Sequence, residues 1–275
     1  MKTVLCIICL LILVIVFIAW IIWSNLSIET SNFTVLSEKL PNSFEGFKIA
    51  HISDLHNAEF GENNIKLIEK LREEKPDIIA ITGDSIDSRH TDMDITLNFF
   101  EQAMEIAQCY FVVGNHESRF EKSVYQSFEA RLVELGVIVL HNEVAVIEKN
   151  GENIALFGID DPNFNNDFYN NLEQGVQSEL FTVLLSHRPE YFEEYAKNAY
   201  DIVLSGHAHG GQFRLPLIGG LYAPRQGLFP KYDSGIYVQD NTTMIVSRGL
   251  GNSSFPIRFN NRPELIIIEL CKEVR

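Results

Sequence analysis

The first pattern along the chain is an unbroken run of apolar side chains from Val4 to Trp23. At about 1.5 Å of rise per helical residue, this run matches the length of a hydrocarbon core of roughly 30 Å. A core helix of a soluble domain normally carries a polar stripe, whereas this segment is apolar on every side. The pattern therefore predicts a membrane-spanning helix within an anchor segment, residues 1–24.

The residues on either side of this run indicate whether it is cleaved and in which direction it crosses the membrane. Trp20 and Trp23 near its end are typical of the aromatic belt at a membrane interface. A cleaved signal peptide would have a shorter apolar region followed by a small-residue cleavage site, so we favour an uncleaved anchor. Lys2 precedes the span, and Glu29 and Glu38 follow it. By the positive-inside tendency, we expect a single-pass cell-membrane protein with its main domain outside the cytoplasm.

After a juxtamembrane segment, residues 25–46, strand-length apolar runs alternate with helical patterns. Strands are predicted at 48–53, 77–82, 110–113 and 137–140, with helices between them at 63–74, 94–108 and 121–135. Further strands are predicted at 144–148, 154–159, 181–186, 201–205, 236–239, 243–247 and 264–270. Short apolar strands separated by helices are typical of a parallel sheet covered on both faces, so the pattern favours a layered α/β sandwich.

Residues 47–275 show no linker-like composition shift and no internal repeat, so we expect one folded domain after the anchor. The stretch from Gly211 to Ser234 holds several glycines and prolines and has no clear periodicity. A loop of that length inside a compact domain is uncommon and is often functional.

Composition narrows the classes of partner. The chain has 22 basic and 37 acidic residues and a net charge of -15, which argues against a general nucleic-acid-binding surface. Two of its four cysteines, Cys6 and Cys9, lie in the apolar run, and the other two are Cys109 and Cys271. This distribution does not indicate a disulfide scaffold.

Residues able to bind metal ions follow five of the predicted strands. They are Asp54 and His56, then Asp84 with Asp87, then Asn115 with His116 and Glu117, then His187, and finally His207 with His209. Asp84 follows Asp54 by 30 residues, and Asn115 follows Asp84 by 31, each about one strand–helix–strand unit. Successive parallel strands deliver such residues to one edge of the sheet, where α/β proteins bind ligands.

The donor types indicate which ions this edge would hold. Oxygen and imidazole donors without a thiolate suit manganese, iron or zinc better than calcium. Two ions are favoured over one, because seven candidate ligands exceed the needs of a single site. If Asp84 bridges the ions, the local charge stays positive and attracts a phosphate despite the acidic composition.

The motifs Asp-x-His, Gly-Asp-x-x-Asp, Gly-Asn-His-Glu and Gly-His-Ala-His, with a lone His after a strand, occur here in this order. They resemble those of the calcineurin-like metallophosphoesterase superfamily, from about Ile49 to Gly210. The Gly-His-Ala-His-Gly-Gly-Gln form and the later run from Ser247 to Gly251 look like a bacterial branch of membrane-associated or exported phosphoesterases. This resemblance implies a four-layer α/β/β/α sandwich of two mixed sheets.

The resemblance also implies a role for each motif residue. One metal would be held by Asp54, His56, Asp84 and His209, and the other by Asp84, Asn115, His187 and His207. His116 would donate a hydrogen bond or a proton to the phosphate or the leaving oxygen. Glu117, where the family more often has Asp, would orient His116, and Asp87 would support His56 or its loop.

The implied activity is hydrolysis of phosphodiesters or phosphomonoesters, by attack of a hydroxide that bridges two divalent ions. The alternatives are a pyrophosphatase acting on a nucleotide-diphosphate lipid precursor, such as UDP-2,3-diacylglucosamine, and a non-catalytic scaffold of the same fold. Arg248 and Arg258 either reach the substrate phosphate or hold the structure. The 211–234 loop either forms an apolar wall that faces the bilayer and admits lipid-linked substrates, or packs over the sheet edge.

Overall fold

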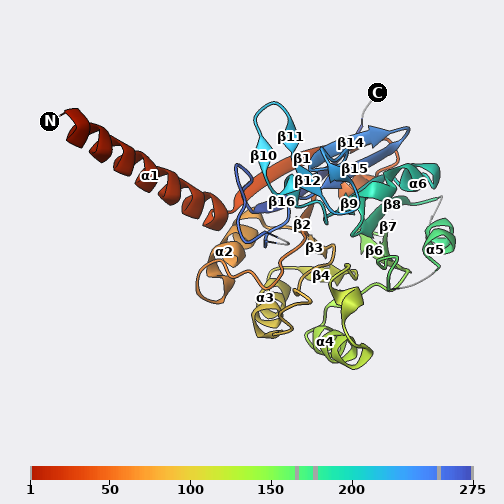
Figure 1. Ribbon diagram of the computed structural model, residues 1–275. Helices are drawn as coiled ribbons and strands as arrows, with labels where there is room; N and C mark the ends of the chain where they lie inside the picture. The colour runs from red at the N-terminus through yellow and green to blue at the C-terminus, as the bar shows by residue number, and fades with distance from the viewer. Residues whose placement is uncertain (1, 165–166, 176–178, 253–254, 274–275) are drawn as a thin grey trace.

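The computed structural model describes residues 2–164, 167–175, 179–252 and 255–273. Helix α1 (Lys2–Leu26) projects away from an α/β domain that the rest of the described chain forms (Figure 1). Among the described residues, α1 is the single helix that is long and apolar enough to cross a membrane, and none of the residues in its most apolar stretch is buried inside the domain.

The first sheet has six strands, in the order β1 (Glu29–Ser37), β16 (Glu264–Lys272), β2 (Phe47–Ile52), β3 (Ile78–Ile81), β4 (Gln108–Phe111) and β5 (Ile138–Val139). Strands β2 to β5 run parallel to one another. Strand β16 runs antiparallel to β2, and β1 pairs with β16 in parallel. The sheet is therefore mixed, with a parallel part that carries the first three motifs.

The second sheet also has six strands, in the order β14 (Gly235–Gln239), β15 (Thr242–Val246), β9 (Ile202–Ser205), β8 (Phe181–Ser186), β7 (Glu152–Ile159) and β6 (Glu143–Lys149). Its four central strands are parallel, and its two outer strands are antiparallel to their neighbours. The parallel centres were predicted from the apolar strands. The antiparallel pair of β16 with β2 in the first sheet, and the two antiparallel outer strands of the second, give both sheets the mixed character that the resemblance implied.

Three apolar clusters separate the layers. Because side chains alternate along a strand, Ile49 of β2 packs between the sheets with Val183 of β8, whereas Ile52 faces outward. Helices α2 (Ile65–Glu74), α3 (Asp94–Met104) and α4 (Lys122–Glu134) cover the outer face of the first sheet. Helices α5 (Phe168–Gln174) and α6 (Phe192–Lys197) cover the outer face of the second. The order of layers is α/β/β/α.

Several elements were not predicted. Strand β1 lies within the expected juxtamembrane segment, and α5 and α6 were not recognised. The loop after residue 211 contains two short hairpins, formed by β10 (Arg214–Leu215) with β11 (Gly219–Gly220) and β12 (Tyr222–Ala223) with β13 (Gly227–Leu228). Single turns of 3-10 helix occur at Asn42–Phe44, Glu62–Asn64, Glu117–Arg119, Pro189–Tyr191 and His209–Gly211.

Candidate metal centre

The seven candidate metal ligands lie in the turns that follow β2, β3 and β4 of the first sheet and β8 and β9 of the second. All seven are buried, with relative exposures of 7% or less. The two sheets therefore present the carboxyl ends of their parallel strands to one shared site. This is the place that the strand spacing predicted for the first three motifs.

The turns that carry the ligands have unusual backbone conformations. Five of the seven residues have positive φ angles between 47° and 65°, namely Asp54, His56, Asp84, His207 and His209. A residue with a side chain adopts this region at a cost of order 1–3 kcal/mol. Such strain persists where the surrounding structure fixes the chain, so these turns are held in place to aim their side chains.

Two glycines bring the β3 and β4 turns into direct contact. A Cβ atom on Gly83 would lie 2.5 Å from the Cα of Gly114, and one on Gly114 would clash with the Asp84 carboxylate. The glycine before Asp84 and the glycine before Asn115 are therefore needed for the backbones to approach each other, which explains their place in both motifs.

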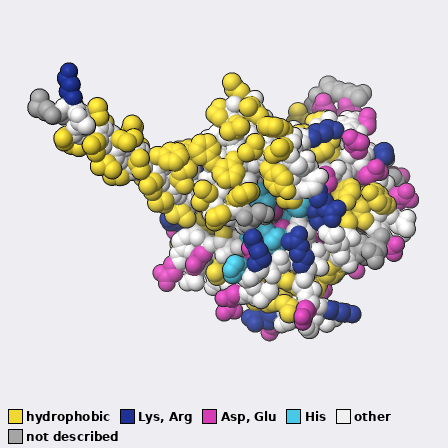
Figure 2. Space-filling view, viewed as in Figure 1, with side chains coloured by type: hydrophobic (Ala, Val, Ile, Leu, Met, Phe, Trp, Pro, Cys, Tyr) yellow, Lys and Arg dark blue, Asp and Glu magenta, His cyan; other side chains and the backbone are white. Residues whose placement is uncertain are grey.

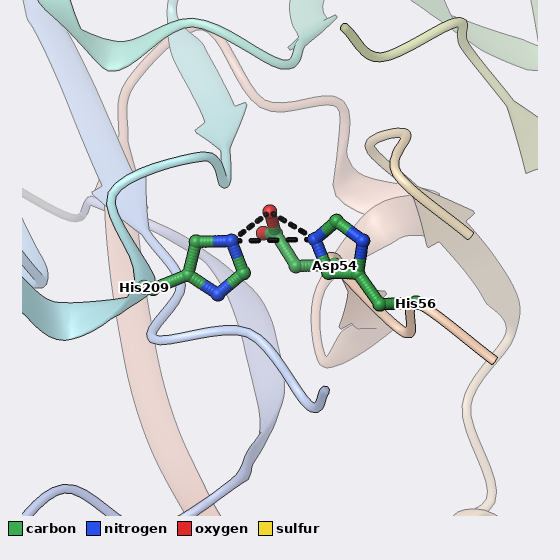
Figure 3. Close-up of side chains that lie close together, drawn as sticks. All are labelled: Asp54, His56 and His209. Carbon is green, nitrogen blue, oxygen red and sulfur yellow. Dashed lines mark hydrogen bonds and ion pairs between the residues drawn. The ribbon is translucent and has the colours of Figure 1, made fainter. Parts of the chain in front are cut away.

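The first group of side chains consists of Asp54, His56 and His209 (Figure 3). The Nε2 atoms of His56 and His209 lie 3.3 Å apart, and each faces Asp54 Oδ1, at 3.8 and 3.2 Å. Burial alone would raise the pKa of Asp54, but His209 and His56 hold that pKa well below its usual range. The carboxylate is therefore ionised and can bind a cation.

The second group centres on His187 Nε2. It lies 3.2 Å from Asp84 Oδ2, 3.1 Å from Asn115 Oδ1 and 3.1 Å from His207 Nδ1. His187 Nδ1 donates to the carbonyl of Thr82 at 2.7 Å, so in the neutral ring the lone pair of Nε2 faces the group. Burial alone would lower the pKa of His187, but Asp84 and Asp54 raise it to about 10. The local field therefore favours positive charge here.

Asp84 connects the two groups. Its Oδ1 accepts the backbone N–H of His116 at 2.7 Å, so Oδ2 is turned toward both groups. Oδ2 lies 3.6 Å from His56 Nε2 and 3.2 Å from His187 Nε2. One carboxylate oxygen thus borders both sets of donors.

The donor set fits metal ions. Ligand atoms about 2.1 Å from a common zinc-like cation lie roughly 3.4 Å from one another in a tetrahedral shell. In both groups, oxygen and imidazole nitrogen atoms converge at separations of 3.1 to 3.8 Å. Lone pairs this close together in a buried site repel one another, and a bound cation would offset that repulsion.

His116 stands beside the two groups. Its Nδ1 accepts the backbone N–H of Ser88 at 3.0 Å, so the neutral ring carries its proton on Nε2. Nε2 points toward the site, 4.0 Å from Asp84 Oδ2. Burial is the largest of the causes that lower the pKa of His116 to about 4. The ring is therefore neutral at pH 7 and has an N–H to donate.

Two of the expected supporting roles need correction. Glu117 does not orient His116, because its carboxylate accepts the backbone N–H groups of the β3 turn and of Gly114 instead. Asp87 is the residue beside His116, with Oδ1 3.3 Å from Nδ1. Asp87 also pairs with Arg89 at 2.6 Å, within the loop that follows β3.

The two arginines left open by the sequence have structural roles. Arg248 pairs with Glu264 at 2.8 Å and with Glu29 at 3.2 Å. Arg258 is 1% exposed and donates to the backbone carbonyls of Arg248 and Gly251. Neither guanidinium is free to reach a substrate.

Three residues that no motif signalled line the cavity over the site. This cavity of about 120 Å³ is bordered by Arg119, Tyr222 and Pro224, by His116, and by four of the seven candidate ligands, Asp84, Asn115, His207 and His209. Arg119 follows the third motif and is exposed, and the other two belong to the 211–234 loop. Arg188 was also missed; its Nη1 lies 2.7 Å from His207 Nε2, on the side of the ring opposite to the Nδ1 that faces His187.

Comparison with known proteins agrees with this geometry. The family model described as calcineurin-like phosphoesterase matches residues 47–211. An uncharacterized metallophosphoesterase of Bacillus subtilis, YkuE, is 32% identical over 88% of this chain and 85% of its own length. The phosphodiesterase YaeI of Escherichia coli is 29% identical, over 82% of each chain.

A third relative bears on the helix. A zebrafish (Danio rerio) transmembrane protein with a metallophosphoesterase domain is 30% identical over 85% of this chain and 55% of its own. Together with the exposed apolar helix α1, this similarity indicates membrane anchoring. Since the family model covers more than half of the chain and every strand end that bears a candidate ligand, the chain belongs to the calcineurin-like phosphoesterase family and is a metal-dependent hydrolase of phosphate esters.

Proposed function

We propose that the protein is a phosphodiesterase that uses two divalent metal ions, chosen from manganese, iron and zinc. The observation that carries this proposal is the position of Asp84 Oδ2 between two groups of buried donors. Asp54, His56 and His209 would hold one ion, and Asn115, His187 and His207 the other. Asp84 would be shared.

The metal ions supply two effects when bound: they offset the negative charge of the phosphate, and they make a water molecule a competent nucleophile at neutral pH. With only Asp54 and Asp84 as anionic ligands, the loaded site keeps a positive charge. That local charge favours a phosphate ester even though the whole chain carries a net charge of -15.

The protein's own residues position the ester and manage its leaving group. His116 would donate from Nε2 to a phosphate oxygen or to the departing alkoxide. Asp87, 3.3 Å from the other ring nitrogen, would stabilise the ring if it became charged. Arg119 at the cavity edge would bind a phosphate oxygen that the metals do not contact. Tyr222 and Pro224 would exclude water from one side.

The substrate and its location are part of the same proposal. We expect the domain to act outside the cytoplasm on a phosphodiester, and a lipid-linked one is favoured because two cavity residues come from an apolar loop. A diphosphate ester with a lipid tail, such as the nucleotide-linked precursor considered above, is the second candidate for the same reason.

The test is hydrolysis of bis-p-nitrophenyl phosphate by the full chain with manganese. Asp84→Asn removes the shared anionic ligand, so we expect kcat to fall by a factor of about a hundred or more, in the range of losses seen when a group essential to charge stabilisation is removed. Asp240→Asn is the matched control, because Asp240 is exposed in a turn with φ 53°, which asparagine also tolerates.

Metal analysis of both variants separates the possible failures. The proposal requires two ions per chain in the wild type and in Asp240→Asn, and fewer in Asp84→Asn. A folded, metal-loaded wild type that cleaves no phosphate ester would favour a scaffold of the same fold. A single ion with full activity would overturn the two-metal arrangement.

A further inference from the structure

Helix α1 is fixed to the domain at its carboxyl end. Asn25 and Arg258 exchange two hydrogen bonds, from Asn25 Nδ2 to the Arg258 carbonyl at 2.9 Å and from the Arg258 N–H to Asn25 Oδ1 at 2.7 Å. The Arg262 guanidinium lies over the Trp23 ring at 4.9 Å and donates to Ser27. Only two residues separate the end of α1 from the start of strand β1. The direction of α1 relative to the domain is therefore set.

A segment of the domain lies alongside the apolar part of this helix. The Phe259 ring packs against Trp20 at 5.3 Å and against Phe17 at 6.5 Å between centroids. At about 1.5 Å per residue, Phe17 lies roughly 13 Å before Leu26, the last residue of α1. If α1 spans a bilayer with Trp23 at the interface, Phe259 must lie at the level of the bilayer surface or below it.

The hairpin β10–β11 begins beside Phe259. Arg214 donates its backbone N–H to the Phe259 carbonyl at 3.0 Å, and Phe213 packs on Phe255 at 5.5 Å. At the hairpin tip, Leu217 is fully exposed and Ile218 is 62% exposed. A protein surface in water rarely presents such side chains together.

More exposed apolar side chains adjoin this tip. The set that we call the apolar rim consists of Leu217, Ile218, Leu228, Phe229, Phe255 and Ile257. Figure 2 shows apolar side chains continuing from α1 across the top of the domain, with histidines at the border of this region. Tyr222, the first residue of the second hairpin, pairs with Leu228 of the rim and lines the cavity over the metal centre. The rim thus joins the helix to the mouth of the site.

The charges of these segments differ from those of the whole chain. None of the 37 acidic residues falls within 202–232 or 241–263, the segments that carry the rim. One acidic residue from elsewhere in the chain, Glu59, lines the same groove as the rim residue Ile257. Both segments carry basic residues, including Arg225 in the first. Arg214 and Lys231 of that segment are paired with Asp233 and Glu193, at 2.9 and 3.2 Å. An anionic bilayer surface would repel the acidic remainder of the chain and accept this face.

We propose that the apolar rim is a second membrane-contact surface, which seats the catalytic domain on the bilayer that α1 enters and turns the mouth of the site toward lipid headgroups. Continuity with α1, the depth of Phe259 and the lack of acidic residues all favour a lipid surface as the occupant. This inference does not depend on which ester the site cleaves.

The test measures the depth of the rim in the full chain, reconstituted in vesicles of phosphatidylethanolamine and phosphatidylglycerol. Cys6, Cys9 and Cys271 are replaced by alanine, and Cys109 is buried and stays. A nitrobenzoxadiazole dye on Leu217→Cys is expected to shift its emission to the blue and to lose most of its intensity to quenchers on the acyl chains. A second label on Phe229→Cys should behave in the same way.

Val133→Cys is the control, because Val133 is an apolar residue on α4, far from α1 in Figure 1, and its exposure of 58% matches the 59% of Phe229. Its dye should keep the emission of a water-exposed label. Water-like emission at position 217 would overturn the proposal. So would a protected dye that acyl-chain quenchers do not reach, which would indicate a second copy of the chain on the rim. Hydrolysis of a soluble diester by each labelled protein reports separately on folding and on the catalytic proposal.

Discussion

At the scale of single residues, Glu117 has a structural role in the candidate metal centre that the sequence did not predict. Its Oε1 accepts the N–H groups of Ser85 and Ile86, and its Oε2 accepts those of Asp84 and Gly114, at 2.7 to 3.2 Å. The carboxylate therefore holds the β3 turn, which has a positive φ at Asp84. This position explains why an acidic residue follows His116 although it does not contact that ring.

The change Glu117→Gln tests this role. The amide keeps one oxygen for two of the N–H groups and turns an NH2 donor toward the other two. With hydrogen bonds to a charged group contributing about 1.5–3 kcal/mol each, we expect the free energy of unfolding to fall by about 3 kcal/mol or more. Urea denaturation followed by circular dichroism measures it.

The control for this change is Glu121→Gln, because Glu121 is exposed at the start of α4. It should leave the urea midpoint unchanged. If Glu117→Gln unfolds at the wild-type midpoint and lowers only kcat, the carboxylate acts on catalysis rather than on the turn.

The candidate ligands could be predicted because each is tied to a strand end by a short motif. Periodicity located the strands, and the carboxyl ends of parallel strands share an edge. Arg119 and Tyr222 could not be predicted in the same way, because their places in the cavity depend on how a 3-10 turn and a hairpin pack. The partners of Glu117 could not be predicted, because they are backbone N–H groups, which the sequence does not distinguish from one another.

At the scale of elements, strand β1 completes the first sheet from outside the predicted domain. Its nine residues pair in parallel with β16, from Glu29 with Glu264 to Ser37 with Lys272. The strand was not predicted because it has several polar residues and only Val35 is fully buried along it. Helices α5 and α6 were not predicted from the sequence because they have only seven and six residues. Pairing and packing, rather than local pattern, determine these elements.

Two truncations test the contribution of β1. A chain that begins at Ser27 lacks α1 but keeps the strand, and we expect it to remain folded and to hydrolyse a soluble diester. A chain that begins at Glu38 also lacks β1, which leaves the edge of β16 unpaired, and an exposed, apolar edge strand favours aggregation. Size-exclusion chromatography distinguishes a monodisperse species from an aggregate.

The pair of truncations serves as its own control, since both remove the apolar helix. Equal behaviour would show that β1 is dispensable, and that the juxtamembrane segment is only a connection. Aggregation of both chains would mean that its cause is the loss of the contacts that α1 makes with Phe259 and Arg262, and not the loss of β1.

At the scale of the whole molecule, the two sheets, the helix and the apolar rim form one connected arrangement. The two sheets converge on the metal centre, and the hairpins after His209 extend from that centre to the side where α1 emerges. The layer order was predictable from the family resemblance. The course of the 211–234 loop was not, because its hairpins of two-residue strands carry no periodic signal.

This arrangement predicts that the attachment of α1 affects some substrates and not others. Asn25→Ala removes both hydrogen bonds to the Arg258 backbone and allows the domain to tilt on its helix. We compare two diesters with the same p-nitrophenyl leaving group, one with a long alkyl chain that inserts into vesicles and one with a methyl group that stays in water. The wild type should favour the alkyl ester, and Asn25→Ala should lose that preference while hydrolysing the methyl ester at the wild-type rate.

The control for this change is Asn32→Ala, at an exposed position on β1, which should change neither rate. Because both esters undergo the same reaction, an equal loss on both would mean that Asn25 supports the metal centre itself. An unchanged preference would mean that the rim alone, without a fixed helix, keeps the site at the bilayer surface.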